Sequence, residues 1–241
     1  MALIRRAIAW VSRRTGRPEL LATLYSSARV DLREQIAVTA VVAAVLRRDG
    51  VYVDVGATRG QVLREAVRVA PEARHIAFEP IPGLAAELAA AFPGVECRQL
   101  AIADRPGVAE FCHFRTLDGW SGLQRSLEIS DAQGDPEYIS VEVSTLDAEV
   151  GEMVPTVVKI DVEGAELRVL EGARKLLAQA RPLLIFEHVA SAAELYGASS
   201  EALWDLLDSA GYEVFSIGGA GPFDRRGFAA AEGVVNWLGR P

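Results

Sequence analysis

The sequence predicts an open α/β fold built on a mostly parallel sheet. Short apolar runs alternate with segments of helical periodicity, which is the pattern of strand–helix–strand units. The first run ends in an aspartate and a glycine-rich turn, and parallel α/β sheets bind their ligands where strands end in this way. With 241 residues, 50% of them hydrophobic, the chain is long enough for one large domain of this class.

Composition argues against several classes of partner. The net charge of −8 and the aromatic content of 7% supply neither the basic surface nor the stacking rings of a nucleic-acid binder. Two cysteines, Cys97 and Cys112, are too few for a disulfide framework, so we expect free thiols and a cytoplasmic location. No apolar run is long enough to cross a bilayer, and we expect no stable membrane insertion.

The chain begins with a basic segment. Residues 1–30 are predicted to form a helical N-terminal arm with five arginines before the first acid. We expect a solvated helix packed on the domain; weak contact with an anionic surface is the alternative. Residues 31–241 are predicted to form the main domain, beginning with a helix over 31–48 that ends near Gly50.

The stretch YVDVGATRGQ (residues 52–61) predicts a strand, a tight turn and the start of a helix. Gly56 allows a positive φ, and Gly60 leaves room for something close to the helix N-terminus. The turn lacks the middle glycine of a dinucleotide fingerprint, and Asp54 would repel a pyrophosphate. The acid suits the sulfonium and ammonium of S-adenosylmethionine. Its structural alternative is to cap the turn through its own backbone.

A second acid lies at the end of the next predicted strand. That strand covers residues 75–80 and places Glu79 at its end, 23 residues after Gly56. A carboxylate near this offset is placed to accept both ribose hydroxyls of an adenosine. Pro80 fixes the exit of the segment, which weakens the alternative that Glu79 is an ordinary surface acid. Asp54 and Glu79 together are a more specific signal than either alone.

The exit of the third predicted strand is the expected adenine region. A helix over 84–92 precedes this strand, which covers 95–100, and Ala101 to Asp104 lead out of it. Small apolar residues such as Ala101 would sandwich the ring, and Asp104 would accept from its amino group. Asp104 is equally suited to start a turn before the following Pro-Gly.

The alternation of strands and helices then breaks. Residues 108–114 and 138–144 alternate apolar and polar side chains, which predicts an inserted antiparallel β-hairpin. The polar loop between them (115–137) and the glycine-rich segment 218–233 are candidate lids or rims. Trp120 in the first of these either stacks on a ligand or anchors the loop to the core.

Four further apolar runs complete a predicted sheet of seven strands. They lie at 157–161, 183–188, 212–217 and 234–238, and helices are expected from about 162 to 180 and over 199–209.

Polar groups at the ends of two of these strands are the candidate catalytic residues. Asp161 faces the methionine end of the cofactor or the acceptor, and Glu187 and His188 end the next strand. We hypothesise that His188 or Asp161 is the base, with Glu187 orienting the histidine or a substrate hydroxyl. Ligation of a divalent cation by Asp161, Glu163 and Glu187 ranks lower, because such acids have ordinary structural roles, and we expect no metal.

Several of these motifs together resemble the FkbM family of methyltransferases. The matching segments are DVGA at 54–57, GQ at 60–61, FEP at 78–80, LAIAD at 100–104 and KIDVEGAE at 159–166. The last segment is the most specific, and the resemblance covers roughly residues 31–240. Thr58 stands where the family usually has asparagine, and its hydroxyl can still form a hydrogen bond there.

The resemblance implies a class I, Rossmann-like methyltransferase fold whose seven strands run in the order 3-2-1-4-5-7-6, the last one antiparallel. It implies S-adenosylmethionine as methyl donor and S-adenosylhomocysteine as product. It also implies transfer to oxygen, commonly a hydroxyl of a sugar, glycolipid or secondary metabolite. The residues expected around the cofactor are Asp54, Gly56, Ala57, Thr58, Gly60, Gln61, Glu79, Pro80, Ala101, Asp104 and Asp161.

Two other functions compete with methyl transfer. A nicotinamide-dependent oxidoreductase would explain Glu79 and the strand pattern, but neither Asp54 nor the missing glycine. A catalytically silent binding subunit would keep the sheet without needing both acids. For an enzyme, the expected partner is a small-molecule or glycan acceptor; the sequence indicates neither the acceptor nor the oligomeric state.

Overall fold

The computed structural model describes residues 33–113, 122 and 137–241 of the protein. The predicted basic arm (1–30) lies outside the described residues, as does most of the predicted lid at 115–137 with Trp120. Within the part that is described, none of the helices has both the length and the apolar composition needed to span a membrane.

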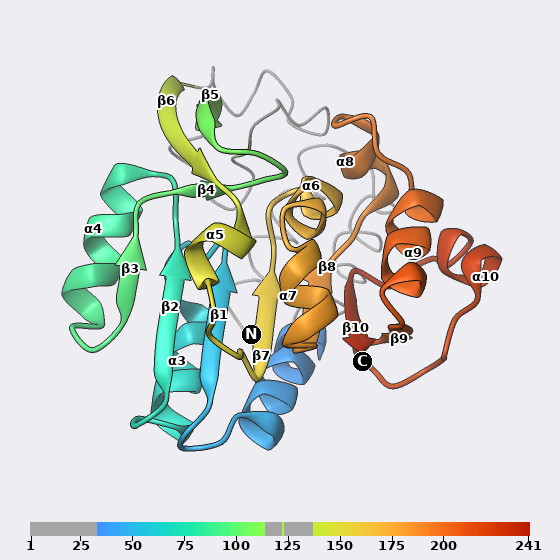
Figure 1. Cartoon of the computed structure of the whole chain (residues 1–241), viewed down its shortest axis with the longest axis horizontal. Helices are drawn as coiled ribbons and strands as arrows, with labels where there is room; N and C mark the ends of the chain where they lie inside the picture. Colours follow the sequence, from blue (N-terminus) through green and yellow to red (C-terminus); the bar gives the residue numbers. More distant parts are fainter. Residues whose placement is uncertain (1–32, 114–121, 123–136) are drawn as a thin grey trace, which may run out of the picture.

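A seven-stranded sheet forms the centre of the fold, in the order β3-β2-β1-β7-β8-β10-β9 (Figure 1). Its strands are β1 (Val51–Val55), β2 (Arg74–Phe78), β3 (Glu96–Arg98), β7 (Val157–Ile160), β8 (Leu183–Glu187), β9 (Glu213–Ser216) and β10 (Asn236–Arg240). β10 runs antiparallel to both neighbours, and the other pairs are parallel. Counting only the strands of this sheet along the chain, the order is 3-2-1-4-5-7-6, as the family resemblance implied.

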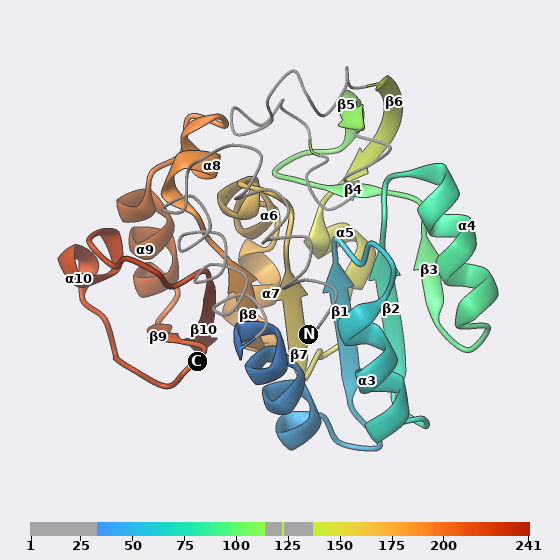
Figure 2. The ribbon, with the colours of Figure 1, turned by 180° about the vertical axis from the view of Figure 1, so that it is seen from behind.

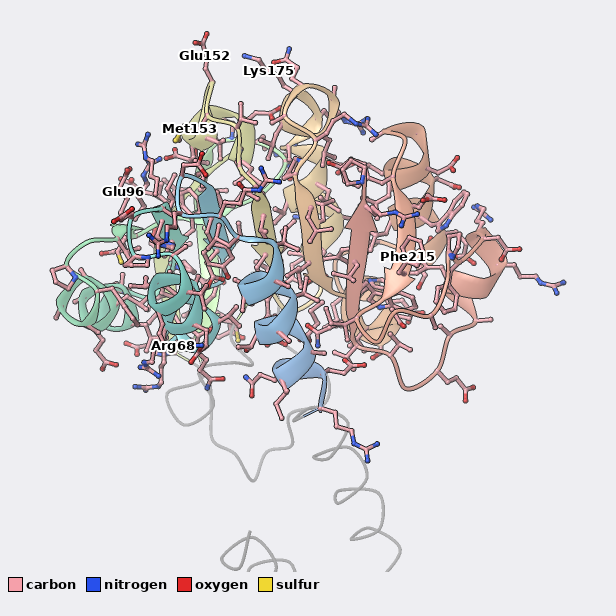
Figure 3. All side chains as sticks on the ribbon, turned by 90° about the horizontal axis from the view of Figure 1, so that it is seen from below. Arg68, Glu96, Glu152, Met153, Lys175 and Phe215 are labelled. Carbon is pink, nitrogen blue, oxygen red and sulfur yellow. The ribbon has the colours of Figure 1, made fainter. Side chains whose placement is uncertain are left out.

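Helices cover both faces of the sheet (Figures 1 and 2). Their bounds are 33–45 for the first described helix, then α3 (Gln61–Val69), α4 (Pro82–Ala91), α5 (Leu146–Val150), α6 (Glu166–Glu171), α7 (Arg174–Gln179), α8 (Ala190–Glu194), α9 (Ser200–Ser209) and α10 (Arg225–Ala229). In Figure 3 the labelled Lys175 of α7 lies on one side of the sheet and Arg68 of α3 on the other.

The central strands β1, β2, β7 and β8 are mostly apolar because both of their faces are buried. Neighbouring residues on a strand point to opposite faces. Val53 and Val158 belong to the core cluster shared with α5, α6, α7 and α9. Tyr52 and Val157, one position earlier, belong to the cluster shared with α3 and the helix at 33–45.

A second sheet of three strands, in the order β4-β6-β5, lies beyond the carboxyl ends of the main sheet. β5 (Gly107–His113) and β6 (Glu137–Ser144) pair antiparallel, so the two predicted strands are confirmed. Most of their connection lies outside the described residues, so the hairpin itself stays a prediction. β4 (Ala101–Ile102), which pairs parallel with β6, falls where the sequence predicted a loop.

The single helix predicted from about 162 to 180 is wrong, because the structure divides it into α6 and α7. A Cβ at Gly172, between them, would lie 2.1 Å from the carbonyl oxygen of Ala103, so the chain approaches too closely there for a side chain. Asp147 of α5 then caps the new helix start. Its carboxylate accepts from the backbone N–H groups of Lys175 at 2.9 Å and Leu176 at 2.8 Å.

We expect Asp147→Ala to lower the free energy of unfolding by about 1–2 kcal/mol, because it leaves the first N–H groups of α7 without their acceptor. Urea denaturation of the purified chain measures this change. Glu152→Ala, an exposed acid just after α5, is the control and should leave stability unchanged. Equal stability of the two variants would contradict the assigned cap.

Candidate functional site

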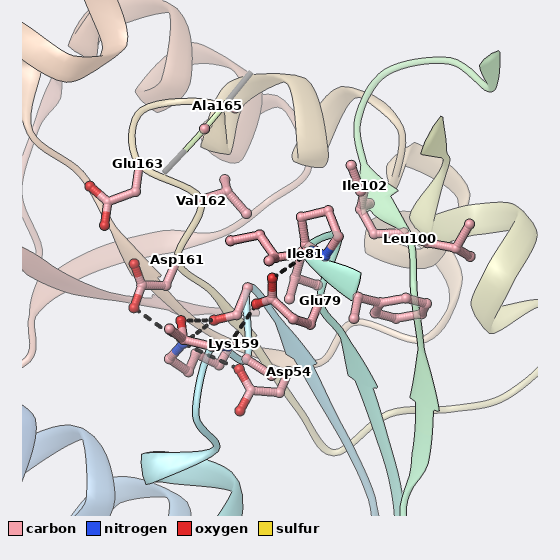
Figure 4. A pocket seen from close by; sticks show the side chains of 18 of the residues that line it. Asp54, Glu79, Ile81, Leu100, Ile102, Lys159, Asp161, Val162, Glu163 and Ala165 are labelled. Atoms are coloured by element: carbon pink, nitrogen blue, oxygen red, sulfur yellow. Dashed lines mark hydrogen bonds and ion pairs between the residues drawn. The ribbon is translucent and has the colours of Figure 1, made fainter. Parts of the chain in front are cut away.

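A cavity of about 460 Å³ opens at the carboxyl ends of β1, β2 and β7 (Figure 4). This volume lies within the range usual for small-molecule sites. The predicted site residues that line it are Asp54, Gly56, Ala57, Thr58, Gln61, Glu79, Pro80, Ala101 and Asp161. The predicted site residues that do not line it are Gly60, Asp104, Glu187 and His188.

Asp54 lies at the base of the cavity and is held by two protein groups. Its side chain is 1% exposed. Oδ1 lies 3.2 Å from the Lys159 ammonium, and Oδ2 accepts from the Tyr52 hydroxyl at 3.2 Å. Burial raises the pKa of Asp54, and the positive charge of Lys159 opposes that rise.

Lys159 is a site residue that the sequence reasoning missed. It pairs with Asp54 across β1 and β7, and its Nζ also lies 3.2 Å from Asp161 Oδ2 and 3.4 Å from the Gly56 carbonyl oxygen (Figure 4). Burial lowers the pKa of Lys159, but the charges of Asp161 and Asp54 outweigh it and the net shift is upward. A lysine inside the apolar run VVKI was the available signal, because a buried ammonium requires acid partners.

Glu79 joins the first turn to the exit of β2. It is 4% exposed and accepts from the backbone N–H groups of Thr58 and Ile81, each at 2.9 Å. The bond to Thr58 holds that residue at a φ of 48°, in the left-handed region. Asparagine, which the family resemblance implies at this position, adopts this region more readily than a β-branched residue such as threonine.

The two glycines of the turn make room for protein atoms. Gly56 has a φ of 79°, and a Cβ there would lie 1.9 Å from the Asp161 carbonyl oxygen. At Gly60, with a φ of 70°, a Cβ would meet the Phe92 ring at 2.6 Å and Leu88 at 2.9 Å. The expectation that Gly60 admits a ligand is therefore corrected, since its missing side chain lets α4 pack against the start of α3.

Three acids gather beside the cavity. Side-chain oxygens of Asp161, Glu163 and Glu187 lie within 4.8 Å of one another. Burial, together with the charges of Asp161, Glu163 and Glu166, raises the pKa of Glu187 well above its usual range. Carboxylate oxygens are the ligands that Ca²⁺ and Mg²⁺ prefer, and three of them would supply part of such a coordination shell, so the metal interpretation has a geometric basis. A proton held by Glu187 relieves the same repulsion without a metal.

Glu166 supports the loop that carries two of these acids. Its Oε1 accepts from the backbone N–H groups of Val162 at 3.2 Å and Gly164 at 3.1 Å. The side chain is almost fully buried, and burial raises its pKa to about 7 despite these hydrogen bonds. The sequence pattern gave no indication of this role.

The helix at 33–45 also reaches the cavity. Glu34 anchors it to the loop before β10 by accepting from the backbone N–H groups of Val235 at 3.2 Å and Asn236 at 2.8 Å. The next residue, Gln35, lines the cavity and donates to the side-chain oxygen of Gln61. The sequence placed a helix here without indicating that it forms part of the site.

Comparison with models of protein families identifies the family of this chain. Residues 54–214, two thirds of the chain and the part that carries the cavity acids, match the model of the Methyltransferase FkbM domain. The chain belongs to the FkbM methyltransferase family. S-adenosylmethionine is therefore its methyl donor, as the resemblance implied.

Solved structures give weaker similarities. Methyltransferase FkbM from Methylobacillus flagellatus KT is 18% identical with a TM-score of 0.49; the match covers 81% of this chain and 45% of that one. A precorrin-6y C5,15-methyltransferase from Geobacter metallireducens GS-15 is 16% identical over 73% of this chain and 72% of that one, with a TM-score of 0.40.

The plantazolicin methyltransferase BpumL, solved with S-adenosylhomocysteine and a monoazolic desmethylPZN analog, is 12% identical over 99% of both chains, with a TM-score of 0.44. Curated proteins give no match. The assignment to the FkbM family therefore rests on the match over residues 54–214.

His188 of this FkbM family member is not where a base for the cavity is needed. Strand alternation turns it to the opposite face from Glu187. It is buried with Nε2 2.8 Å from the Ser200 hydroxyl, and its ring stacks on Phe228 with centroids 5.2 Å apart. Burial lowers the pKa of His188 to about 4. The hypothesis that His188 is the base is corrected, because the structure gives it a packing role.

Only the first part of the expected adenine region lines the cavity. Leu100, Ala101 and Ile102 line the cavity and supply apolar surface there. Asp104 lies outside the lining, and its carboxylate is 3.8 Å from Arg105. Because Ala101 and Ile102 are paired with β6 as strand β4, the chain leaves the cavity before it reaches Asp104.

Glu166→Gln should remove a pH dependence of stability. The pKa of Glu166 in the folded chain, about 7, lies above its ordinary value of 4.5, so its stabilising contribution is complete below about pH 4.5 and is lost as the pH rises through 7. We expect the wild type to lose roughly 3 kcal/mol relative to the glutamine variant over this window.

Urea denaturation of both proteins across the same pH range measures the difference. Glu171→Gln, an exposed acid of the same helix, is the control and should follow the wild-type curve. Parallel curves for the wild type and Glu166→Gln would show that Glu166 is not buried with a raised pKa.

Proposed function

We propose that this FkbM family methyltransferase transfers a methyl group from S-adenosylmethionine to a hydroxyl oxygen of a sugar, glycolipid or secondary metabolite. The observation that carries the proposal is that Asp54, Glu79 and Asp161, from three neighbouring strand ends, line one cavity around the Gly56 turn. Family membership supports the donor, and the family resemblance supports oxygen as the acceptor atom.

The residues present fit the donor. A carboxylate has about four acceptor positions, so Glu79 can hold its two backbone N–H groups and still accept from ribose hydroxyls. Leu100 and Ala101 offer apolar surface for an adenine. At the other end, Asp54 and Asp161 share one ammonium, that of Lys159. The net negative charge of this group suits a sulfonium and an ammonium.

The role proposed for Asp54 therefore changes in one respect. Both of its carboxylate oxygens already have protein partners, Lys159 and Tyr52. Direct capture of the methionine ammonium by Asp54 would compete with those bonds. We assign Asp54 to the charge and shape of the cavity floor.

Asp161 is the proposed base. When bound, S-adenosylmethionine supplies a methyl group already activated by a positively charged sulfur. An alcohol must also lose its proton as it accepts that group, and a positioned base typically adds about 10²–10⁴-fold to the rate. The Asp161 side chain is 32% exposed and lines the cavity. Lys159 holds its Oδ2, and we assign Oδ1 to receive the proton.

The domain division, the N-terminal arm and the cellular location of the protein remain predictions. We predict that residues 31–241 form the methyltransferase domain. Residues 1–30 are predicted to form a separate, solvated helical arm, with weak contact to an anionic surface as the alternative. We also predict a cytoplasmic location. Cys97 and Cys112 are free thiols, in agreement with the last of these. The FkbM assignment favours methyl transfer over a nicotinamide-dependent oxidoreductase, and a catalytically silent subunit is the remaining rival.

Incubation with labelled S-adenosylmethionine and a panel of sugars, glycolipids and polyketides tests the proposal, with the product identified by mass and the methylated atom by NMR. Calorimetric titration with S-adenosylhomocysteine accompanies it. Label on an acceptor oxygen is the expected result. Label on nitrogen or carbon would overturn oxygen as the acceptor atom. Absence of S-adenosylhomocysteine binding would favour the silent subunit.

Glu79→Ala should weaken binding of S-adenosylhomocysteine by about 1–3 kcal/mol, roughly 5–150-fold, because charge-assisted hydrogen bonds to the ribose are removed. Calorimetry gives the affinity, and thermal unfolding confirms that the variant folds. Glu72→Ala, an exposed acid before β2, is the control. An unchanged affinity for Glu79→Ala would place Glu79 away from the ribose.

Asp161→Asn should lower kcat by about 10²–10⁴-fold while S-adenosylhomocysteine still binds. His188→Asn, which changes a buried side chain outside the cavity, should keep kcat within about tenfold of the wild type. Steady-state kinetics on an acceptor found in the panel measures both. If His188→Asn shows the larger loss, the base has been assigned to the wrong residue.

A further inference from the structure

Lys159 has so far been described only as the shared partner of Asp54 and Asp161, yet it lies at the centre of the site. It is 8% exposed and sits in β7 among buried apolar neighbours. A buried ammonium without partners would be strongly unfavourable. Its partners are therefore the reason that a lysine can occupy this position.

The geometry gives the Lys159 ammonium three acceptors from different parts of the site. Asp54 is its neighbour across β1 and β7, and Asp161 follows two residues later, on the same side of the chain. Their carboxylate oxygens each lie 3.2 Å from Nζ, and the Gly56 carbonyl oxygen lies at 3.4 Å. An ammonium has three N–H donors, so one group connects the cavity floor, the glycine turn and the proposed base.

These contacts distinguish between possible roles of Lys159. A lysine that acts as base or nucleophile must give up its proton, but the two carboxylates hold the proton on this one. A purely structural ion pair would need only Asp54. The contact with Asp161, whose side chain is partly exposed to the cavity, indicates that Lys159 also acts on a residue of the chemical step.

We propose that Lys159 is a positioning residue, which fixes the carboxylate of Asp161 in the orientation for proton removal and holds it in register with the Gly56 turn. This inference rests on the proposed function. Without the ammonium, Asp161 is no longer held at Oδ2, and Asp54 is a buried acid without its cation. The charged groups facing Lys159 are Asp54 of β1, Asp161, and Glu187 at the end of β8, and the Tyr52 hydroxyl faces Asp54.

A double-mutant cycle between Lys159 and Asp161 tests this role. Lys159→Met, which keeps a long side chain without the charge, should lower kcat by on the order of tenfold or more in the wild-type background. In the Asp161→Asn background the same change should lower kcat less than about threefold, because the residue through which Lys159 acts is already disabled. Equal losses in the two backgrounds, or no loss in either, would overturn the proposal.

A second readout requires no acceptor. With Lys159→Met we expect the affinity for S-adenosylhomocysteine to fall as the pH falls from about 8 to 6, since Asp54 takes up a proton more readily without its cation. The wild type should show a smaller dependence. If both show the same dependence, Lys159 does not set the charge of the cavity floor.

Controls separate failure of this inference from failure of the proposed function. Lys175→Met changes the other lysine of the chain, exposed on α7, and should match the wild type in all measurements. If Lys159→Met does not fold, Lys159→Gln keeps hydrogen-bond donors without the charge and takes its place in the cycle. A wild type that does not bind S-adenosylhomocysteine contradicts the proposed function, whereas equal losses in the cycle contradict only the role of Lys159.

Discussion

The ion pair between Lys159 and Asp54 is the interaction on which the site depends. Both groups are buried in adjacent central strands, and either charge alone would be costly there. A shift in the register of β7 against β1 would separate them and turn side chains to the wrong face. The pair therefore fixes where the first turn and the segment after β7 meet. At that meeting point a side chain on Gly56 would collide with Asp161.

The acids around this pair differ in the charged and hydrogen-bonding groups that surround them. Asp54 shares a cation, Glu79 is bound by backbone N–H groups, and Glu187 is crowded by other acids, which raises its pKa. Similar residues at similar strand ends can thus hold charge, bind hydroxyls or retain a proton. The difference comes from their partners, which is how folded proteins assign separate roles to carboxylates.

Short elements were the main errors in the predicted fold. β4 has two residues, too few for a periodic signal, and it forms only because β6 lies beside it. The predicted irregular segment 218–233 contains α10, whose start is capped by Asp224. α6 and α7 are separated by a close approach to Ala103, which is distant in sequence. These features depend on contacts between remote segments, and local patterns do not contain that information.

The sequence by itself determined the seven main strands, the glycine turn and the family, because apolar runs and turn residues act locally. It also brought Asp54, Glu79 and Asp161 to one edge of the sheet, since parallel strands end at the same edge. Only the tertiary structure showed that His188 points away from the cavity and that Lys159 joins two of the acids. Which face a strand-end residue takes, and which residue lies opposite it across 105 positions of chain, are decided by strand pairing and packing.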